Sequence, residues 1–317
     1  MNTVTSQQGL LSSKERRAAR FLALKKRRPG LAQWIEVFPY LLPTILGFLF
    51  VYIGPVIASF ILSFTSWDLV RPPEWIGIGN YQRMLGSPLF LRVMKNTFHF
   101  VLLYLPPSVI LPLLLAVLLN NKLRGVNLIR SAIFLPAVVS TVAVGIVWQW
   151  LYNQEFGILN YFLKTIGVAG PAWLNHPRWA MWSIVIMSVW KVLGYNMVIY
   201  LAGLQNIPQD YYDSARIDGA SAWKELIHIT VPLVSPSTFF VLTISLINSF
   251  QIFEQTFMLT QGGPAYGTLT LSFYIYQQAF QFSRMGYGAA LAYVMFVILL
   301  AFTIVGLQYQ KKWVHYY

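Results

Sequence analysis

Residues 205–232 read QNIPQDYYDSARIDGASAWKELIHITVP and form a long polar segment between two apolar stretches. Pro208, with glutamine, aspartate and tyrosine behind it, is typical of a helix start. A glycine near the middle of the segment would break or bend a helix. We therefore expect two short helices joined at Asp218–Gly219–Ala220, the second running from Ser221 to about Ile229 and ended by Pro232.

The residues of this segment allow two interpretations. Apolar side chains recur at helical spacing at Ala215, Ile217, Ala222 and Leu226. Two short helices at an angle would form a rigid knob that transmits force from a soluble partner. A helix with one apolar face could equally lie in the lipid headgroups. Periodicity alone does not separate these possibilities.

The composition around the segment is that of a membrane protein. Of 317 residues, 56% are apolar and 10% are charged, while soluble domains carry about 25% charged residues. A single soluble domain and a disordered chain are both excluded by these values. Six stretches have the roughly 20 apolar residues that a membrane-spanning helix needs. They are Val37–Phe64, Phe98–Leu119, Ile129–Leu151, Trp179–Leu204, Leu233–Thr256 and Gly288–Tyr309.

Basic residues predict the orientation of these spans. The segments on the side of the amino terminus carry 15 Lys and Arg, and those on the opposite side carry 7. Basic residues are retained on the cytoplasmic side, so both termini are expected in the cytoplasm. The net charge of +13 is largely explained by this bias and by a basic tail over residues 1–35. We interpret the tail as a cytosolic retention signal and headgroup anchor rather than a nucleic-acid-binding arm or a cleavable signal peptide.

The spacing within 205–232 resembles a known signature. Asp213-Ser214-Ala215, Gly219, Ile229 and Pro232 follow the spacing E-A-A-x3-G-x9-I-x-L-P, the "EAA" signature of binding-protein-dependent ABC importer permeases. The chain departs from it with aspartate for glutamate, serine for the first alanine, and valine for leucine at Val231. Other fragments resemble the carbohydrate-uptake branch, similar to the maltose and glycerol-phosphate permeases, over residues 36–310. These are Pro39–Pro43, Gly79-Asn80-Tyr81, Asn96-Thr97, Phe134-Leu135-Pro136, Trp148-Gln149-Trp150, Gly157 with Asn160, Ile217-Asp218-Gly219-Ala220, and Thr260-Gln261-Gly262-Gly263-Pro264.

The resemblance implies an all-α polytopic membrane protein with the six-helix fold of a type I ABC importer permease. Its parts would be the basic tail 1–35, a permease domain 36–310 with a coupling loop at 205–232, and a cytoplasmic tail 311–317. The implied partners are a sister permease, two cytosolic ATPase subunits and an extracytoplasmic solute-binding protein, at the plasma (inner) membrane of a prokaryote. The residues implied to contact the ATPase are Asp213, Ser214, Ala215, Asp218, Gly219 and Ala220.

The chain is not expected to be an enzyme. It has no G-x-x-x-x-G-K-[ST], so ATP and Mg²⁺ would bind to the partner ATPase subunits and no cofactor is expected here. It also has no H-E-x-x-H motif and no cysteine. A secondary transporter or channel would show an inverted repeat or rings of charge, and a membrane enzyme would show a nucleophile or a metal cluster. Neither pattern is visible.

Polar residues inside the predicted spans mark a candidate pathway, because burying them in lipid is costly. Asn248, Gln251 and Glu254 recur every third residue on one expected helix face, and a hydroxyl-rich ligand needs such partners. Alternatively, Lys191 and Glu254 pair with each other or with the sister subunit, or the side chains reach the membrane interface. The candidate substrate-binding residues are Lys191, Tyr195, Asn196, Asn248, Gln251 and Glu254. Whether the substrate is a saccharide, a sugar alcohol or a glycerol phosphate is left open.

Overall fold

The computed structural model describes residues 29–120 and 124–314, and its regular structure there is almost entirely helical. Most of the predicted basic tail and the last three residues lie outside this range. The chain divides into two compact units, Met1–Ile61 and Leu62–Tyr317.

The described part of the first unit is an apolar helix. It consists of α2 (Pro29–Phe48), the π-helical turn η1 (Leu49–Ile53) and most of α3 (Gly54–Leu62). Val37–Leu62 is long and apolar enough to cross a membrane, which confirms the first predicted span to within two residues. Its side chains in this window are not buried within the chain.

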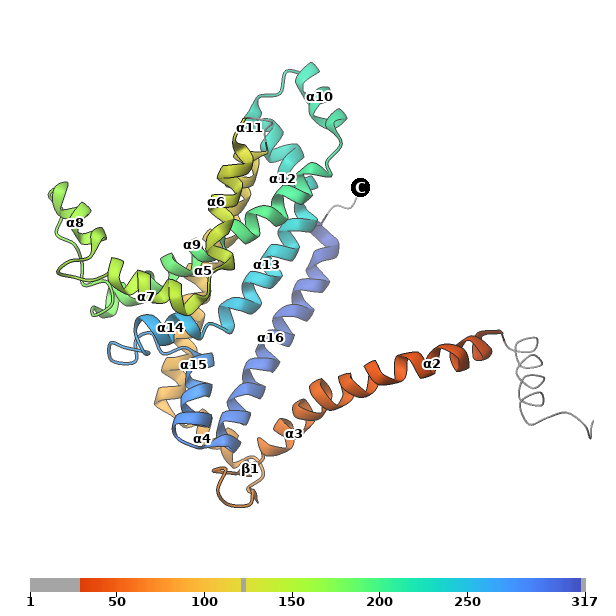
Figure 1. Cartoon of the computed structure of the whole chain (residues 1–317), viewed down its shortest axis with the longest axis vertical. Helices are drawn as coiled ribbons and strands as arrows, with labels where there is room; N and C mark the ends of the chain where they lie inside the picture. The colour runs from red at the N-terminus through yellow and green to blue at the C-terminus, as the bar shows by residue number, and fades with distance from the viewer. Residues whose placement is uncertain (1–28, 121–123, 315–317) are drawn as a thin grey trace, which may run out of the picture. The chain divides into compact units, whose positions relative to one another are not determined.

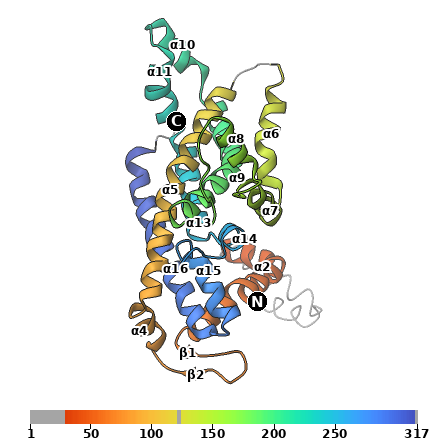
Figure 2. The same cartoon turned by 90° about the vertical axis from the view of Figure 1, so that its left-hand side faces the viewer.

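Long helices packed side by side form the second unit. They are α5 (Pro88–Leu119), α9 (Pro177–Gln205), α13 (Ser235–Phe250) and α16 (Met285–Trp313). Helix α5 packs against α9 and α13, and α13 also packs against α9 and α16 (Figures 1 and 2). Helices α5, α9 and α16 are each long and apolar enough to span a membrane, in agreement with three predicted spans.

Two predicted spans are not straight helices. The third is divided into α6 (Val126–Val138) and α7 (Thr141–Leu151), which meet at 100°. The fifth begins at a 67° bend between Ala222–Leu233 and α13, and α13 ends at Phe250 rather than at the predicted Thr256. In the described residues, four helices could therefore cross a membrane, or six if each bent pair counts as one span.

Short elements connect the long helices. The strands β1 (Thr65–Ser66) and β2 (Glu74–Trp75) pair antiparallel, and the Asn80 side chain donates to the carbonyls of Ser63 and Thr65 at 2.9 and 2.8 Å. This amide fixes the start of the first loop onto the helix that follows it. The remaining short helices are α4 (Gly79–Leu85), α8 (Ile158–Thr165), α14 (Glu254–Leu259), α15 (Leu271–Tyr276) and the π-helical turn η3 (Gln277–Gln281).

A glycine allows α9 to approach α6 closely. A Cβ built on Gly194 would lie 2.1 Å from the carbonyl oxygen of Ile133 and 2.5 Å from the Cα of Phe134. Both are backbone atoms of α6, so no side-chain rotation could relieve the contact. Small residues at such crossings are how membrane helices gain backbone-to-backbone packing.

We predict that Gly194→Ala destabilises the chain by about 1–3 kcal/mol, because an added methyl would force α6 and α9 apart. Gly47→Ala is the matched control, since a Cβ on Gly47 has no neighbour within 4 Å. Both changes gain about the same helix propensity, so only the steric effect differs. Thermal unfolding of the purified protein in detergent measures the effect. Equal unfolding temperatures for both variants would contradict the close α6–α9 contact.

Candidate functional site

The polar segment forms a helical hairpin with a sharp turn. Helix α10 (Gln209–Ile217) is followed by Asp218 and by Gly219, whose φ is +75°, and α11 (Ala222–Glu225) begins after Ser221. The N–H of Gly219 donates to the carbonyl of Arg216 at 3.0 Å, and the N–H of Ala220 donates to that of Ala215 at 2.9 Å. This pair of bonds is the Schellman motif, which closes a helix at a left-handed residue. The predicted break at residues 218–220 is confirmed.

The glycine is required by backbone conformation rather than by lack of space. A Cβ on Gly219 would meet no atom within 4 Å, but a side chain at this φ is strained. The alanine and the glycine of the EAA spacing are thereby linked physically. Ala215 offers the carbonyl that the turn uses, and Gly219 allows the turn to form.

The second arm of the hairpin does not end at Pro232, contrary to expectation. Helix α11 continues through the π-helical turn η2 (Leu226–Thr230) and α12 (Val231–Leu233) into α13. Proline lacks an N–H, and in an α-helix its ring clashes with the carbonyl four residues back. The wider π turn, closed by the N–H of Val231 on the carbonyl of Leu226, precedes the proline and relieves this conflict. Pro55 follows η1 in the same way, with Gly54 donating to Leu49.

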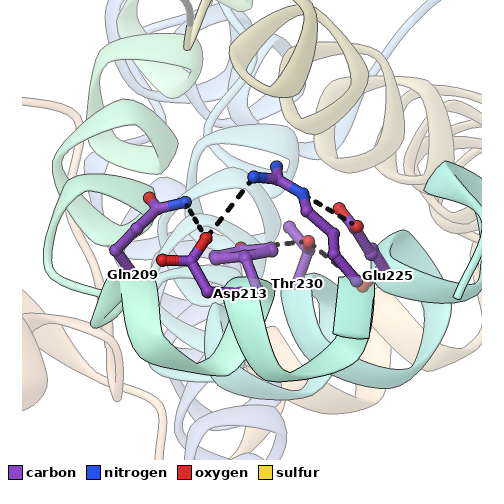
Figure 3. Close-up of polar contacts among 6 residues, drawn as sticks. Gln209, Asp213, Glu225 and Thr230 are labelled. Atoms are coloured by element: carbon purple, nitrogen blue, oxygen red, sulfur yellow. Dashed lines mark hydrogen bonds and ion pairs between the residues drawn. The ribbon is translucent and has the colours of Figure 1, made fainter. Parts of the chain in front are cut away.

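Polar contacts join the two arms (Figure 3). Asp213 accepts from Gln209 at 3.4 Å and from Arg216 at 3.5 Å, and Arg216 also reaches Glu225 at 3.3 Å. The hydroxyls of Tyr212 and Thr230 lie 3.1 Å apart. The spacing of the EAA signature indicated neither Arg216 nor Glu225. The opposite charges of these two residues, one on each side of the break, were the feature of the sequence that could have indicated their contact.

The predicted apolar stripe on this segment is divided between two environments. Ala215 and Leu226 are half-buried, but Ala222 is exposed and Ile217 is 87% exposed. Trp223, also near the turn, is 67% exposed. The end of the hairpin therefore presents apolar side chains that the described part of the chain does not cover.

A cavity of about 510 Å³ brings together five of the six predicted substrate-binding residues. It lies between α9 and the break that follows α13. The predicted residues that line it are Lys191, Tyr195, Asn248, Gln251 and Glu254. Phe100, Tyr104 and Phe253 add aromatic side chains. The mixture of amide, carboxylate and aromatic groups suits a ligand with both hydroxyls and apolar ring faces.

The cavity forms where α13 is interrupted. Helix α13 ends at Phe250 and is capped by Gln251, and Glu254 starts α14 after a break at Ile252 and Phe253. The predicted single helix face is therefore not continuous, although its three polar residues still converge. The carbonyl of Ile252, released by the break, accepts from the hydroxyl of Thr270 at 3.0 Å.

Asn196, the sixth predicted residue, lies outside the cavity lining. It is fully buried, and its amide donates to the carbonyl of Ser108 at 2.8 Å and to the hydroxyl of Ser245 at 3.2 Å. It therefore connects α9 to α5 and α13. Whether Asn196 faces the cavity or the neighbouring helices depends on the rotation of α9 about its own axis. The limits of an apolar span do not define that rotation.

Lys191 contacts the break in the third span. Its Nζ donates to the carbonyl of Val139 at 2.8 Å and to that of Pro136 at 3.4 Å. A cation at the carboxyl end of α6 is also favoured by the helix dipole. No ion pair joins Lys191 to Glu254 in the described structure, where the ion pairs are those of Arg216. The same residue therefore lines the cavity and stabilises the 100° turn beside it.

Comparison with known proteins identifies the chain's relatives. Residues 84–311 match the model of the family described as "Binding-protein-dependent transport system inner membrane component". The chain belongs to this family. It is a permease component of an ABC transporter, a membrane subunit whose family places ATP hydrolysis on partner subunits. In the described ranges, no three His, Asp or Glu side chains are grouped to hold a metal ion.

One sequence relative and two solved structures illustrate the similarity. The chain is 37% identical over 288 residues to AraP of Bacillus subtilis (strain 168), an arabinooligosaccharides transport system permease protein, covering 87% of this chain and 91% of AraP. A bacterial ABC transporter that imports the acidic polysaccharide alginate matches with 26% identity and a TM-score of 0.79, covering 92% of this permease and 99% of that chain. A second structure, with an alginate pentasaccharide-bound periplasmic protein, matches with 25% identity, a TM-score of 0.78, and 88% and 97% coverage.

We predict that Gly219→Ala loosens the hairpin turn, because alanine in the left-handed region costs about 1–2 kcal/mol. Exchange of the Ala220 amide hydrogen should then become about 5- to 30-fold faster. Gly219→Asn should have a smaller effect, since asparagine tolerates this conformation. Gly125→Ala is the control, being another glycine of positive φ with open space around it. Unchanged Ala220 exchange in Gly219→Ala would contradict the assigned turn.

Proposed function

We propose that this permease forms half of the translocation path for a sugar or related polyol. Its assembly contains a sister permease, two ATPase subunits that bind ATP and Mg²⁺, and an extracytoplasmic solute-binding protein. In this proposal the subunit spans the inner membrane of a prokaryote with both termini in the cytoplasm. The AraP relative supports a saccharide substrate, and the alginate importer with its periplasmic protein supports delivery by a binding protein.

The observation that carries the proposal is the continuity between the hairpin and the cavity. The second arm of the hairpin leads through η2 and α12 into α13, and α13 ends at the cavity with Asn248 and Gln251. In the views of Figures 1 and 2, the hairpin lies at one end of α13 and α14 at the other. A displacement of the hairpin by the ATPase would therefore reach substrate-binding groups through helical segments that bend once, by 67°, before α13.

The roles of the cavity residues follow from their chemistry. The amides of Asn248 and Gln251 can donate to and accept from sugar hydroxyls, and the Glu254 carboxylate accepts. Tyr195 offers an aromatic face for a sugar ring. In this proposal Lys191 binds substrate from its position on the carbonyls of α6, and Asn196 supports the site from its buried position between helices. These assignments suit a hydroxyl-rich ligand that is neutral or that carries both positive and negative charge.

The hairpin residues would contact the ATPase. Asp213, Ser214, Ala215, Asp218, Gly219 and Ala220 form or flank the turn and carry the coupling role. The exposed Ile217 and Trp223 give this end an apolar surface that a protein groove would cover. A rigid hairpin held by its Schellman turn can transmit force, whereas a flexible loop would absorb it.

We predict that Asn248→Ala and Gln251→Ala each weaken transport about tenfold or more, because a lost hydrogen bond leaves a buried substrate hydroxyl unpaired. The solute-binding protein is first screened with arabinotriose, lactose, an alginate trisaccharide and glycerol 3-phosphate, and uptake of the ligand found is then measured in proteoliposomes. Thr243→Ala is the control on α13, since the Thr243 hydroxyl donates to Phe239 within its own helix. Unchanged substrate affinity and uptake rate in both amide variants would refute the pathway assignment.

We further predict that Gly219→Arg uncouples ATP hydrolysis from transport in an assembled complex. Arginine in the left-handed region distorts the turn and adds bulk where the ATPase would dock. Gly125→Arg is the control for backbone strain outside the hairpin. Uptake and ATP hydrolysis are measured together on complexes whose subunit ratio has been checked. Normal transport by an intact Gly219→Arg complex would rule out the coupling role.

A further inference from the structure

An ion pair joins the two arms of the coupling hairpin, which is defined here as residues 209–233. The Nε of Arg216 on α10 lies 3.3 Å from a carboxylate oxygen of Glu225 on α11 (Figure 3). The two residues are nine positions apart along the chain, and the Gly219 turn lies between them. In the described structure this is the ion pair that crosses from one arm to the other.

A second contact joins the arms one helical turn farther from the Gly219 turn. The hydroxyls of Tyr212 and Thr230 lie 3.1 Å apart, and the Thr230 hydroxyl donates to the backbone carbonyl of Glu225 at 3.3 Å. Tyr212 and Arg216 are four residues apart and share a face of α10. Glu225 and Thr230 are five apart, a spacing that shares a face because the π-helical turn η2 lies between them. The π turn thus aligns two contact residues on the second arm.

Arg216 also touches the motif acid. Its Nη1 lies 3.5 Å from Asp213, so one guanidinium connects the motif acid of α10 with the carboxylate of α11. The hairpin has two places where it could flex, the Gly219 turn and the 67° bend between Ala222–Leu233 and α13. Contacts between the arms restrict the first of these.

We infer that Arg216 and Glu225 are positioning residues that hold the hairpin arms at a fixed angle, so that force applied at α10 reaches α13. This inference rests on the proposed coupling role of the hairpin. The two residues need not touch the ATPase or the substrate. They act through Asp213 and through the direction of the second arm.

Solvent exposure determines the size of the expected effect. The Arg216 side chain is 59% exposed and that of Glu225 is 15% exposed. Solvent partly screens such a pair. Its removal should therefore lower the ratio of hairpins with the native arm angle to other hairpins by a factor of about two to five, without unfolding the hairpin. High salt should reduce the same difference.

The experiment uses the whole importer in lipid nanodiscs, assembled with partner subunits whose cysteines have been replaced; this chain has no cysteine of its own. Spin labels at Asp210→Cys and Ala222→Cys report the distance between the arms. Coupling is measured as the stimulation of Mg-ATP hydrolysis by the solute-binding protein loaded with the sugar found in the screen. The variants are Arg216→Met, Glu225→Gln, the double variant and Arg216→Lys. Lys224→Met is the control, a neighbouring exposed cation.

We expect Arg216→Met and Glu225→Gln each to broaden the distance distribution and to reduce the stimulation two- to fivefold. The double variant should be no worse than Arg216→Met alone, because that change already removes the contact that Glu225→Gln removes. Arg216→Lys should retain most of the stimulation, and Lys224→Met should match the wild type.

Three results would overturn the inference. The first is that the single variants keep the normal inter-arm distance and the normal stimulation of ATP hydrolysis. The second is that the effects of the two single variants multiply in the double variant, and the third is that Lys224→Met loses as much stimulation as they do. If Gly219→Arg uncouples while the Arg216 and Glu225 variants do not, the positioning role alone fails. If Gly219→Arg also remains coupled, the proposed function of the hairpin fails as well.

Discussion

The helix breaks at Val139, Ile252 and Gly219 leave backbone carbonyls without their intrahelical donors, and the architecture depends on the groups that supply replacements. In an apolar environment an unpaired carbonyl costs several kcal/mol, so a break exists only where a donor can reach it. Lys191 donates to the carbonyls at the α6–α7 break, and Thr270 donates to Ile252 at the break after α13. The backbone itself closes the hairpin turn at Gly219.

These breaks are also where the functional groups gather. A straight helix would carry Asn248, Gln251 and Glu254 along one line, whereas the interruption turns Glu254 back toward a cavity that Lys191 and Tyr195 also line. Lys191 has two roles, since it stabilises a backbone turn and contributes to the cavity wall. Because these polar side chains satisfy backbone carbonyls or line the cavity, they are tolerated inside a membrane domain.

The hairpin and the cavity are connected because proline does not stop the helix between them. The π-helical turn η2 accommodates Pro232, and the arm that begins at Ala222 runs on, with one bend, into α13. The π turn also brings Thr230 into line with Glu225, where both contact the first arm. A local solution to a steric problem thus sets the face by which the two arms of the hairpin meet.

The sequence by itself determined the apolar spans, the polar hairpin with its break at Gly219, and five residues of the cavity. Apolar length, residue spacing and the conformational freedom of glycine are properties of local sequence, so these features could be predicted without a fold. Tertiary structure decided the 100° turn at Val139, the burial of Asn196 between helices and the pairing of Arg216 with Glu225. Each of these depends on which donor, carbonyl or charge a distant segment brings within reach, and periodicity along one helix carries no record of that neighbour.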